Sequence, residues 1–279
     1  HSVEERAAIM LRFHDLVFEH KEKLLDLLQL ETGKARQNAL EEIFETAISA
    51  RYYALRAKKW LKPKRRKGAV PFFTKTHMQH VPVGIVGIIS PWNYPLSIPI
   101  SDAIPALLAG NKVIIKPSEL TPLSALYARK LLIEAGLTED VFSIINGYGA
   151  DLGPALIDLS HYIAFTGSTR TGRIIGKMAG EQLKKCSLEL GGKNPLIALE
   201  DVSATKLAEG IVTACFANTG QLCVSIEQIY LPESRFDELK AAIVEEVKSM
   251  KTGAALDYST QMGSLVSKEH TAKVMEHLL

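Results

Sequence analysis

Strand-like and helix-like segments alternate about five times along residues 84–190, and this alternation limits the possible folds more than any other feature. The strand-like segments, such as 84–90 and 113–116, are short and rich in Val and Ile. Such runs are typical of parallel strands that are buried on both faces. Strands joined through helices lie parallel and connect by right-handed crossovers. We therefore expect an α/β fold built on a doubly wound parallel sheet.

The segments on both sides of the alternating region indicate two domains. Two helical patterns, at 3–30 and at about 38–60, precede it and belong to the first domain. After residue 190 the strand and helix pattern resumes and continues to the last residues. We divide the chain into a first domain at 1–190 and the start of a second α/β domain at 191–279.

A linking stretch at 61–82 lies between the helical and the alternating regions, and we expect it to contribute to oligomer formation. It opens with a dense basic run at 62–67. A localisation signal or an anion-binding patch is one interpretation of such a run, but short runs of this kind more often form solvated loops. We expect a loop.

Charge and cysteine content exclude several function classes. The net charge of +2 gives no electrostatic basis for binding nucleic acid or a membrane surface. Three cysteines in 279 residues do not form a disulfide framework, which indicates a reducing compartment and a cytoplasmic location. No apolar run is long enough to span a membrane, and the cysteines and histidines lack the spacing of a zinc site.

Polar residues follow the predicted strands at the edge where such sheets bind ligands. Asn93 follows the first strand, and its side-chain amide could donate a hydrogen bond to an oxyanion; a turn-forming role is the alternative. Lys116 and Glu119 follow the second strand. They are either a grip for the hydroxyls of a ribose or an exposed ion pair of little energetic weight.

A later strand passes into a helix through Gly167 and Ser168. Backbone N–H groups at such a helix start form a potential phosphate cradle. The G-x-G-x-x-G fingerprint of common dinucleotide-binding sites is absent, because the glycine-rich run at 147–153 has one residue too many before its last glycine.

Cys223 and Glu189 are the candidates for covalent and acid–base chemistry. Cys223 follows a polar turn that contains glycine, whereas Cys186 and Cys215 fit buried structural positions. Strand alternation favours the surface for Glu189, but the glycine pair at 191–192 indicates a close approach by another group. A thiol nucleophile and a base that activates water suffice to form and hydrolyse a thioester.

Five motifs in one order give these residues a common context. They are P-W-N, K-P-S-E, F-T-G-S-T, L-E-L-G-G-K and N-T-G-Q-L-C. The set resembles the aldehyde dehydrogenase superfamily over about residues 83–230, and looks most like its succinate-semialdehyde branch. The resemblance implies a Rossmann-like domain that binds NAD, and an enzyme that oxidises an aldehyde, for instance succinate semialdehyde, to the acid.

The resemblance also assigns roles to residues. It implies that Cys223 is the nucleophile, Glu189 the general base and Asn93 the oxyanion donor. The implied cofactor-binding residues are Pro91, Trp92, Lys116, Glu119, Gly167 and Ser168. Because a carboxylate at Glu119 repels a 2′-phosphate, we expect NAD, with NADP possible through the adjacent Lys116. The family resemblance further implies a homo-oligomer. No metal is expected, because the cysteines and histidines lack metal-ligand spacing.

The sequence departs from the family pattern beyond Cys223, where only 56 residues follow. The family's later E-x-F-G-P segment and most of its second domain are missing, as are its N-terminal strands. We therefore expect a truncated chain. This leaves open a catalytically inert module that binds a nucleotide or another subunit, and also an enzyme that passes the thioester to coenzyme A.

Overall fold

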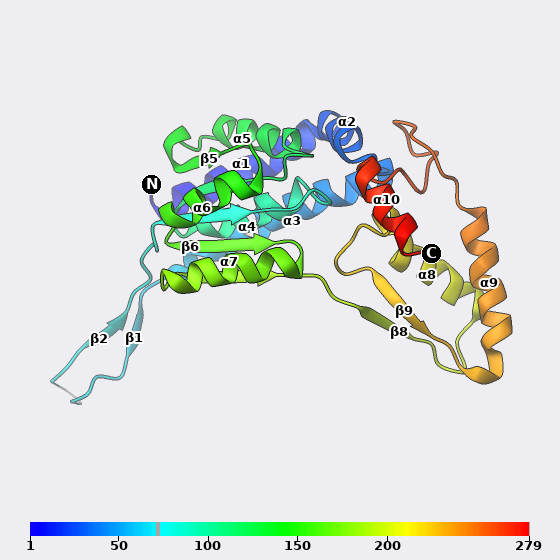
Figure 1. Cartoon of the computed structure of the whole chain (residues 1–279). Coiled ribbons are helices and arrows are strands. Elements are labelled where there is room, and N and C mark those ends of the chain that lie inside the picture. The colour runs from blue at the N-terminus through cyan, green and yellow to red at the C-terminus, as the bar shows by residue number, and fades with distance from the viewer. Residues whose placement is uncertain (71–72, 279) are drawn as a thin grey trace.

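A five-stranded parallel sheet with helices on both faces forms the centre of the molecule (Figure 1). The computed structural model describes residues 1–70 and 73–278. The strand order is β5-β4-β3-β6-β7 and every pairing is parallel, so the predicted doubly wound sheet is confirmed. The strands are β3 (Ile85–Ile89), β4 (Lys112–Lys116), β5 (Phe142–Ile144), β6 (Tyr162–Thr166) and β7 (Lys185–Glu189).

The order of the strands creates a switch point in the middle of the sheet. The chain steps outward from β3 through β4 to β5 and then returns to β6 on the other side of β3. The crossovers after β3 and after β6 therefore leave in opposite directions. In sheets of this type, a crevice for a ligand opens at that point.

Helices cover the sheet in layers. On one face lie α4 (Ser97–Leu108) and α5 (Leu123–Glu134), and on the other lie α6 (Gly149–Leu159) and α7 (Thr169–Glu181). The N-terminal helices α1 (Val3–Glu19), α2 (Lys21–Thr32) and α3 (Arg36–Leu61) pack outside α4 and α5 as a further layer. The helices among residues 1–70 and 73–278 are all too short or too polar to cross a lipid bilayer.

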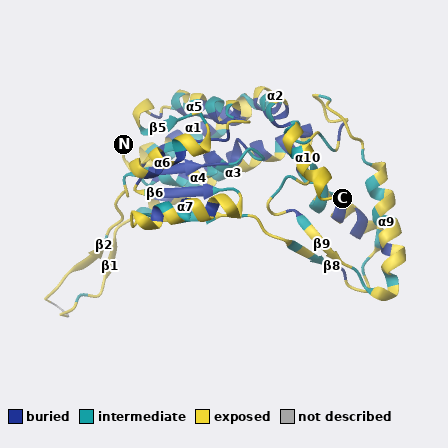
Figure 2. Cartoon of the chain, in the orientation of Figure 1, coloured by how far each residue is buried: buried dark blue, intermediate teal, exposed yellow. Residues whose placement is uncertain are grey.

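The two faces of the sheet have hydrophobic cores of different size. The larger core lies beneath the N-terminal helices and includes Phe13, Leu28, Ile88 and Phe142, each at most 1% exposed. The smaller core lies under α6 and α7 around Ile157. Figure 2 shows the buried residues gathered at the sheet and the helices beside it.

The single helix expected at 3–30 is two helices. The chain leaves helical geometry at His20, where α1 ends and α2 begins. The start of α1 has a capping box: the Ser2 hydroxyl accepts the Glu5 N–H, and the Glu5 carboxylate accepts the Ser2 N–H.

The basic run is part of a hairpin that extends away from the body of the molecule (Figure 1). Its strands are β1 (Lys64–Arg66) and β2 (Thr76–Met78), paired antiparallel. The expectation of a loop was therefore wrong, although the side chains of β1 are exposed as predicted. Within the linking stretch at 61–82, residues 71–72 lie outside the described part of the chain.

After β7 the chain forms a smaller α/β unit (Figure 1). Strands β8 (Asn194–Ile197) and β9 (Ile226–Tyr230) pair in parallel, and α8 (Ala204–Phe216) and α9 (Phe236–Ser249) pack with them around Ile211 and Leu239. The last helix is α10 (Lys268–Glu276); residue 279 lies outside the described residues. The domain boundary at 190/191 stays a prediction. Within residues 1–70 and 73–278, short 3₁₀ segments lie at η1 (Glu139–Val141) and η3 (Glu233–Arg235), and η2 (Ala217–Gly220) is a turn that contains left-handed residues.

Candidate active site

A cleft of about 340 Å³ opens at the switch point of the sheet. The chain segments that leave β3, β6 and β7 form one side of it, and the loop before β9 and helix α10 form the other. Seven of the residues that the sequence singled out line this cleft. They are Pro91, Trp92, Asn93, Gly167, Ser168, Glu189 and Cys223.

The segment from β6 to α7 shapes the floor of the cleft. The Gly167 N–H donates to the Glu189 carbonyl at 3.0 Å, which continues the β6–β7 pairing by one residue. A Cβ at position 167 would lie 2.6 Å from the ring of Phe165, so a larger residue there would require the buried ring to move. Ser168 then caps α7 by accepting the Thr171 N–H at 3.2 Å.

Glu189 is the last residue of β7 and is exposed within the lining of the cleft. Its position at the carboxyl end of an edge strand reconciles strand alternation with a functional role, because here the exposed side faces the cleft. On α4, Asp102 follows the cleft-lining Ile98 by one helical turn. Part of Asp102 is exposed, yet desolvation by the surrounding chain, followed by the charges of Glu189 and Glu45, raises the pKa of its carboxyl from 3.8 to about 6.

Removing the charge at Glu189 is expected to lower the pKa of Asp102. In Glu189→Gln, the like charge is lost while the desolvation remains, so the pKa should fall below about 6 but stay above 3.8. A carbon-13 NMR titration of the Asp102 carboxyl measures this. An Asp102 pKa that is the same in Glu189→Gln and in the native chain would mean that the two carboxylates do not face a common space.

The loop that carries Cys223 has a constrained backbone. Asn218, Thr219 and Gly220 all have positive φ, at 51°, 58° and 73°. A β-branched residue such as threonine rarely adopts this conformation, which costs about 1–3 kcal/mol per residue and persists only where neighbours enforce it. Gln221 supplies part of the enforcement, since its N–H and its side-chain amide both donate to the Asn218 carbonyl.

Cys223 differs from the other two thiols in accessibility. It is exposed, whereas Cys186 and Cys215 are partly buried against apolar neighbours. Burial also raises the pKa of the Cys215 thiol, which reduces its reactivity. The thiol that the sequence selected as nucleophile is therefore the one that a reagent reaches most readily.

Hydrogen bonds join the nucleophile loop to its neighbours on both sides. The Asn93 side-chain amide donates to the Gln221 carbonyl at 2.9 Å, which links the loop after β3 to the loop of the thiol. On the other side, the Asn194 amide donates to the Cys223 and Ser225 carbonyls, each at 2.9 Å. The oxyanion candidate Asn93 and the thiol of Cys223 thus belong to one connected framework.

Lys116 and Glu119 lie outside the lining of this cleft, at the carboxyl end of the neighbouring strand β4. Their side chains form an ion pair at 3.2 Å, and the Lys116 ammonium also donates to the Pro117 carbonyl at 2.6 Å. The ion pair is therefore exposed on one side only: the Lys116 side chain is 3% exposed, whereas that of Glu119 is 42% exposed.

Two residues that the sequence did not reveal complete the rim. His270 and Lys273, on α10, line the cleft. The His270 ring stands edge-on to Trp92 with 4.5 Å between centroids, and burial lowers its pKa. Gln221 also lines the cleft and was not singled out from the sequence. Its place in the N-T-G-Q-L-C motif, two residues before Cys223, was the only sequence signal that could have indicated this position. The helical pattern around His270 gives no indication of a site.

The residues along this edge suit a dinucleotide. The start of α7 offers free N–H groups for a diphosphate, and the amine and carboxylate beyond β4 offer hydrogen bonds to ribose hydroxyls. These features follow strands β4 and β6, which flank the central strand β3 on its two sides.

The fold and the site together define a doubly wound α/β protein with an exposed cysteine, a carboxylate and an amide in the cleft at its switch point. The chain belongs to the aldehyde dehydrogenase family, whose model matches residues 1–278.

Individual relatives agree with this membership. A protein of Mycolicibacterium smegmatis named "Putative succinate-semialdehyde dehydrogenase", with NADP(+) in its name, is 48% identical over 276 residues, which are 99% of this chain and 53% of that protein. Phenylacetaldehyde dehydrogenase of Pseudomonas fluorescens is 38% identical over 98% of this chain and 56% of its own. The chain thus spans about half the length of the curated relatives it matches.

A solved structure of a relative shows the same fold. The NAD⁺ complex of aldehyde dehydrogenase from Bacillus cereus superposes with a TM-score of 0.94 at 35% identity, covering 100% of this chain and 57% of that one.

Proposed function

We propose that this chain forms the dinucleotide-binding and nucleophile-bearing part of an NAD(P)-dependent aldehyde dehydrogenase. The proposed reaction oxidises a short semialdehyde, such as succinate semialdehyde, to the carboxylic acid. One observation carries the proposal: Cys223, Glu189 and Asn93, which come from three separate segments, line a single cleft.

Acylation is the first half of the proposed reaction. The Cys223 thiolate adds to the aldehyde carbon and forms a C–S bond, while the carbonyl electron pair moves onto oxygen. The second N–H of the Asn93 amide, beside the one already held by Gln221, is available to this oxyanion. A bound nicotinamide ring supplies the acceptor for the hydride that leaves the carbon. The product of this half is a thioester on Cys223.

Hydrolysis is the second half. Glu189 accepts a proton from a water molecule, and the water oxygen attacks the thioester carbon. The C–S bond breaks and its electron pair returns to sulfur, which regenerates the thiolate. An exposed carboxylate at the cleft suits this step better than transfer to coenzyme A, which requires no base for water.

Both dinucleotides remain compatible with the proposed site. Lys116 and Glu119 would hold the adenosine ribose, and Gly167 and Ser168 would lie along the diphosphate. The Glu119 carboxylate favours the free 2′-hydroxyl of NAD, while the Lys116 ammonium, 3.2 Å from it, is a cation that could bind a 2′-phosphate. The relative from Mycolicibacterium smegmatis has NADP(+) in its name, and the solved structure from Bacillus cereus is an NAD⁺ complex. These two relatives support considering both dinucleotides as the cofactor.

The proposal includes a homo-oligomer, a dimer or tetramer, in the cytoplasm. A row of exposed apolar side chains along α3, at Phe44, Ile48, Tyr52 and Leu55, supports association. Three free cysteines support a reducing compartment. Light scattering on the purified protein measures the oligomeric state.

An aldehyde panel tests the proposed activity. Absorbance of the reduced nicotinamide is followed with NAD and with NADP, for succinate semialdehyde, shorter semialdehydes and aldehydes that lack a carboxylate. We expect the semialdehydes to give the highest kcat/KM. Binding of a dinucleotide without reduction by any aldehyde would instead identify an inert nucleotide-binding module. Reduction of the dinucleotide that requires coenzyme A would identify a dehydrogenase that passes its thioester to coenzyme A.

Replacing Glu189 with glutamine is expected to stop turnover after acylation. Loss of a general base lowers the rate of its step by about 10²–10⁴-fold, while the addition of Cys223 does not depend on that base. Rapid mixing should therefore show a burst of reduced nicotinamide of one equivalent per Cys223, followed by a slow steady state. Mass spectrometry should find the acyl group on Cys223.

The control for this variant is Glu181→Gln, which changes an exposed carboxylate at the opposite end of α7 from the cleft. Its steady-state rate should equal that of the native protein. A Glu189→Gln variant with a full steady-state rate would assign the water-activating base to another residue.

A further inference from the structure

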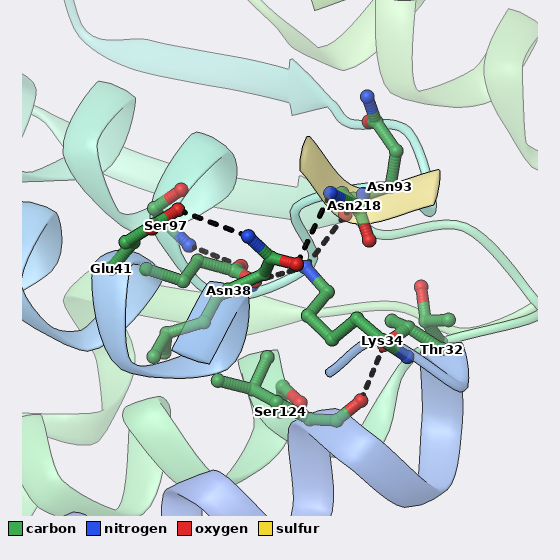
Figure 3. A network of polar contacts seen from close by, with 12 residues as sticks. Thr32, Lys34, Asn38, Glu41, Asn93, Ser97, Ser124 and Asn218 are labelled. Carbon is green, nitrogen blue, oxygen red and sulfur yellow. Dashed lines mark hydrogen bonds and ion pairs between the residues drawn. The ribbon is translucent and has the colours of Figure 1, made fainter. Parts of the chain in front are cut away.

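The chain between the cleft and α4 is held by an ion pair that is completely buried. Lys34 and Glu42 lie 2.7 Å apart, and both side chains are 0% exposed. Neither residue lines the cleft. Figure 3 shows the Lys34 side chain within the polar network that also contains Asn93 and Asn218.

Lys34 holds one end of this segment. It follows Gly33, whose left-handed backbone (φ 73°) ends α2 and turns the chain toward α3. Besides its bond to Glu42, the ammonium donates to the Asn93 carbonyl at 2.8 Å and lies 4.2 Å from the centre of the Tyr94 ring. The cation therefore contacts the backbone of the residue whose side chain is the proposed oxyanion donor.

Glu42 holds the other end. Its second carboxylate oxygen accepts the N–H groups of Leu96 and Ser97 at 2.6 and 3.0 Å. These residues begin α4, and the apolar side chain of Leu96 cannot cap the helix. A carboxylate supplied by α3 takes the place of the usual cap. The segment from Asn93 to Ser97 is thus fixed at both ends by one ion pair.

Asn218 extends the framework to the nucleophile loop. Its side-chain amide donates to the carbonyls of Asn93 and Gln221, at 3.0 and 3.2 Å, and its N–H donates to the Asn38 side chain. The Asn93 carbonyl therefore has two donors, Lys34 and Asn218. The rotation of the peptide at Asn93 is fixed, and with it the direction in which its side chain leaves the backbone.

Energetics favour a positioning role for the pair. Taking two charges out of water costs several kcal/mol each, and well-packed apolar residues of similar volume commonly stabilise a fold as well or better. Mutual attraction alone gives little reason to bury an ion pair here. What the pair provides is geometric: three directed hydrogen bonds to the backbone of a single five-residue segment.

We propose that Lys34 and Glu42 are positioning residues that hold the 93–97 segment from both ends and thereby keep the Asn93 amide directed at an oxyanion formed on Cys223. This inference rests on the proposed aldehyde dehydrogenase function. Neither residue touches the substrate, so their effect on the reaction passes through Asn93.

The test is a double-mutant cycle with a neutral version of the pair. Lys34→Met/Glu42→Gln removes both charges together, so no unpaired buried charge remains, and the glutamine oxygen can still accept from Leu96 and Ser97. In the native background we expect kcat to fall by about 10- to 100-fold, with KM for the aldehyde changed by less than about twofold. In the Asn93→Ala background, itself reduced by about 10²–10³-fold, the further loss should be less than about twofold.

The matched control is Arg36→Met. Arg36 is also a buried cation of the α2–α3 region, but its ion pairs are with Glu22 and Asp26, away from the 93–97 segment. It should change thermal stability and leave kcat unaltered. An equal loss in the native and Asn93→Ala backgrounds, or an unchanged kcat in the neutral-pair variant, overturns the inference.

A measurement that does not depend on enzyme activity tests the positioning role separately from the proposed function. If the native protein oxidises none of the aldehydes, the proposed function fails, and the inference is decided by nitrogen-15 NMR of the Asn93 side-chain amide. We expect the N–H held by the Gln221 carbonyl to exchange slowly with solvent in the native chain and in Arg36→Met, and to exchange faster in the neutral-pair variant. Identical exchange in all three would show that the pair does not position Asn93.

Discussion

Replacing Cys223 with serine is expected to lower kcat for aldehyde oxidation by at least about 10⁴-fold, as removal of a covalent nucleophile typically does. A serine hydroxyl ionises far less readily than a thiol, and no adjacent group replaces the lost thiolate. Dinucleotide binding should be unaffected, because the residues proposed to hold the dinucleotide lie after β3, β4 and β6 and not on the loop of the thiol. Steady-state assays and titration of the bound dinucleotide by fluorescence measure the two quantities.

The control is Cys215→Ser, which changes a partly buried thiol on α8 that packs against the small core of the second unit. We expect some loss of stability and unchanged turnover per folded molecule. Thiol labelling gives a parallel comparison, since the exposed Cys223 should react first. Undiminished turnover in Cys223→Ser would overturn the proposed mechanism altogether.

Replacing Lys34 alone with alanine is expected to destabilise the chain by about 3–5 kcal/mol, the usual cost of leaving one partner of a buried ion pair uncompensated. The Glu42 carboxylate, 0% exposed, would keep its two N–H donors but lose its cation. Urea denaturation followed by circular dichroism measures the free energy of unfolding.

The neutral-pair variant separates charge from packing in the same experiment. Lys34→Met/Glu42→Gln should recover most of the stability lost in Lys34→Ala, because it buries no charge. A loss below about 1 kcal/mol for Lys34→Ala would place this pair in the range of solvent-exposed ion pairs, in conflict with its complete burial.

Local sequence patterns were sufficient to predict the sheet. The apolar run at 84–90 reads as a buried parallel strand, and it becomes β3, the central strand. Asn93 and Gly167 could be located for the same reason, because both follow strands whose carboxyl ends meet at one edge of a parallel sheet. Glu189 and Cys223 were selected by the motifs that resemble the family, since strand alternation alone favoured the surface for Glu189.

Features that depend on distant contacts could not be predicted. Nothing beside Lys34 in the sequence indicates that its partners are Glu42 and the carbonyl of Asn93, 59 positions away. His270 reaches the cleft only because α10 packs against the loop of Trp92. The basic run became a strand because residues at 76–78 pair with it, a contact that no local propensity encodes.

The bond between the Asn218 N–H and the Asn38 side chain spans 180 positions of the chain. A loop held in a left-handed conformation by such a remote partner cannot acquire its shape early in folding, since closing so long a loop carries an entropic cost that only the nearly complete structure repays. The thiol therefore reaches its working geometry only when the first helices and the far half of the chain have met. During synthesis, the reactive centre stays unassembled until almost the whole segment has left the ribosome.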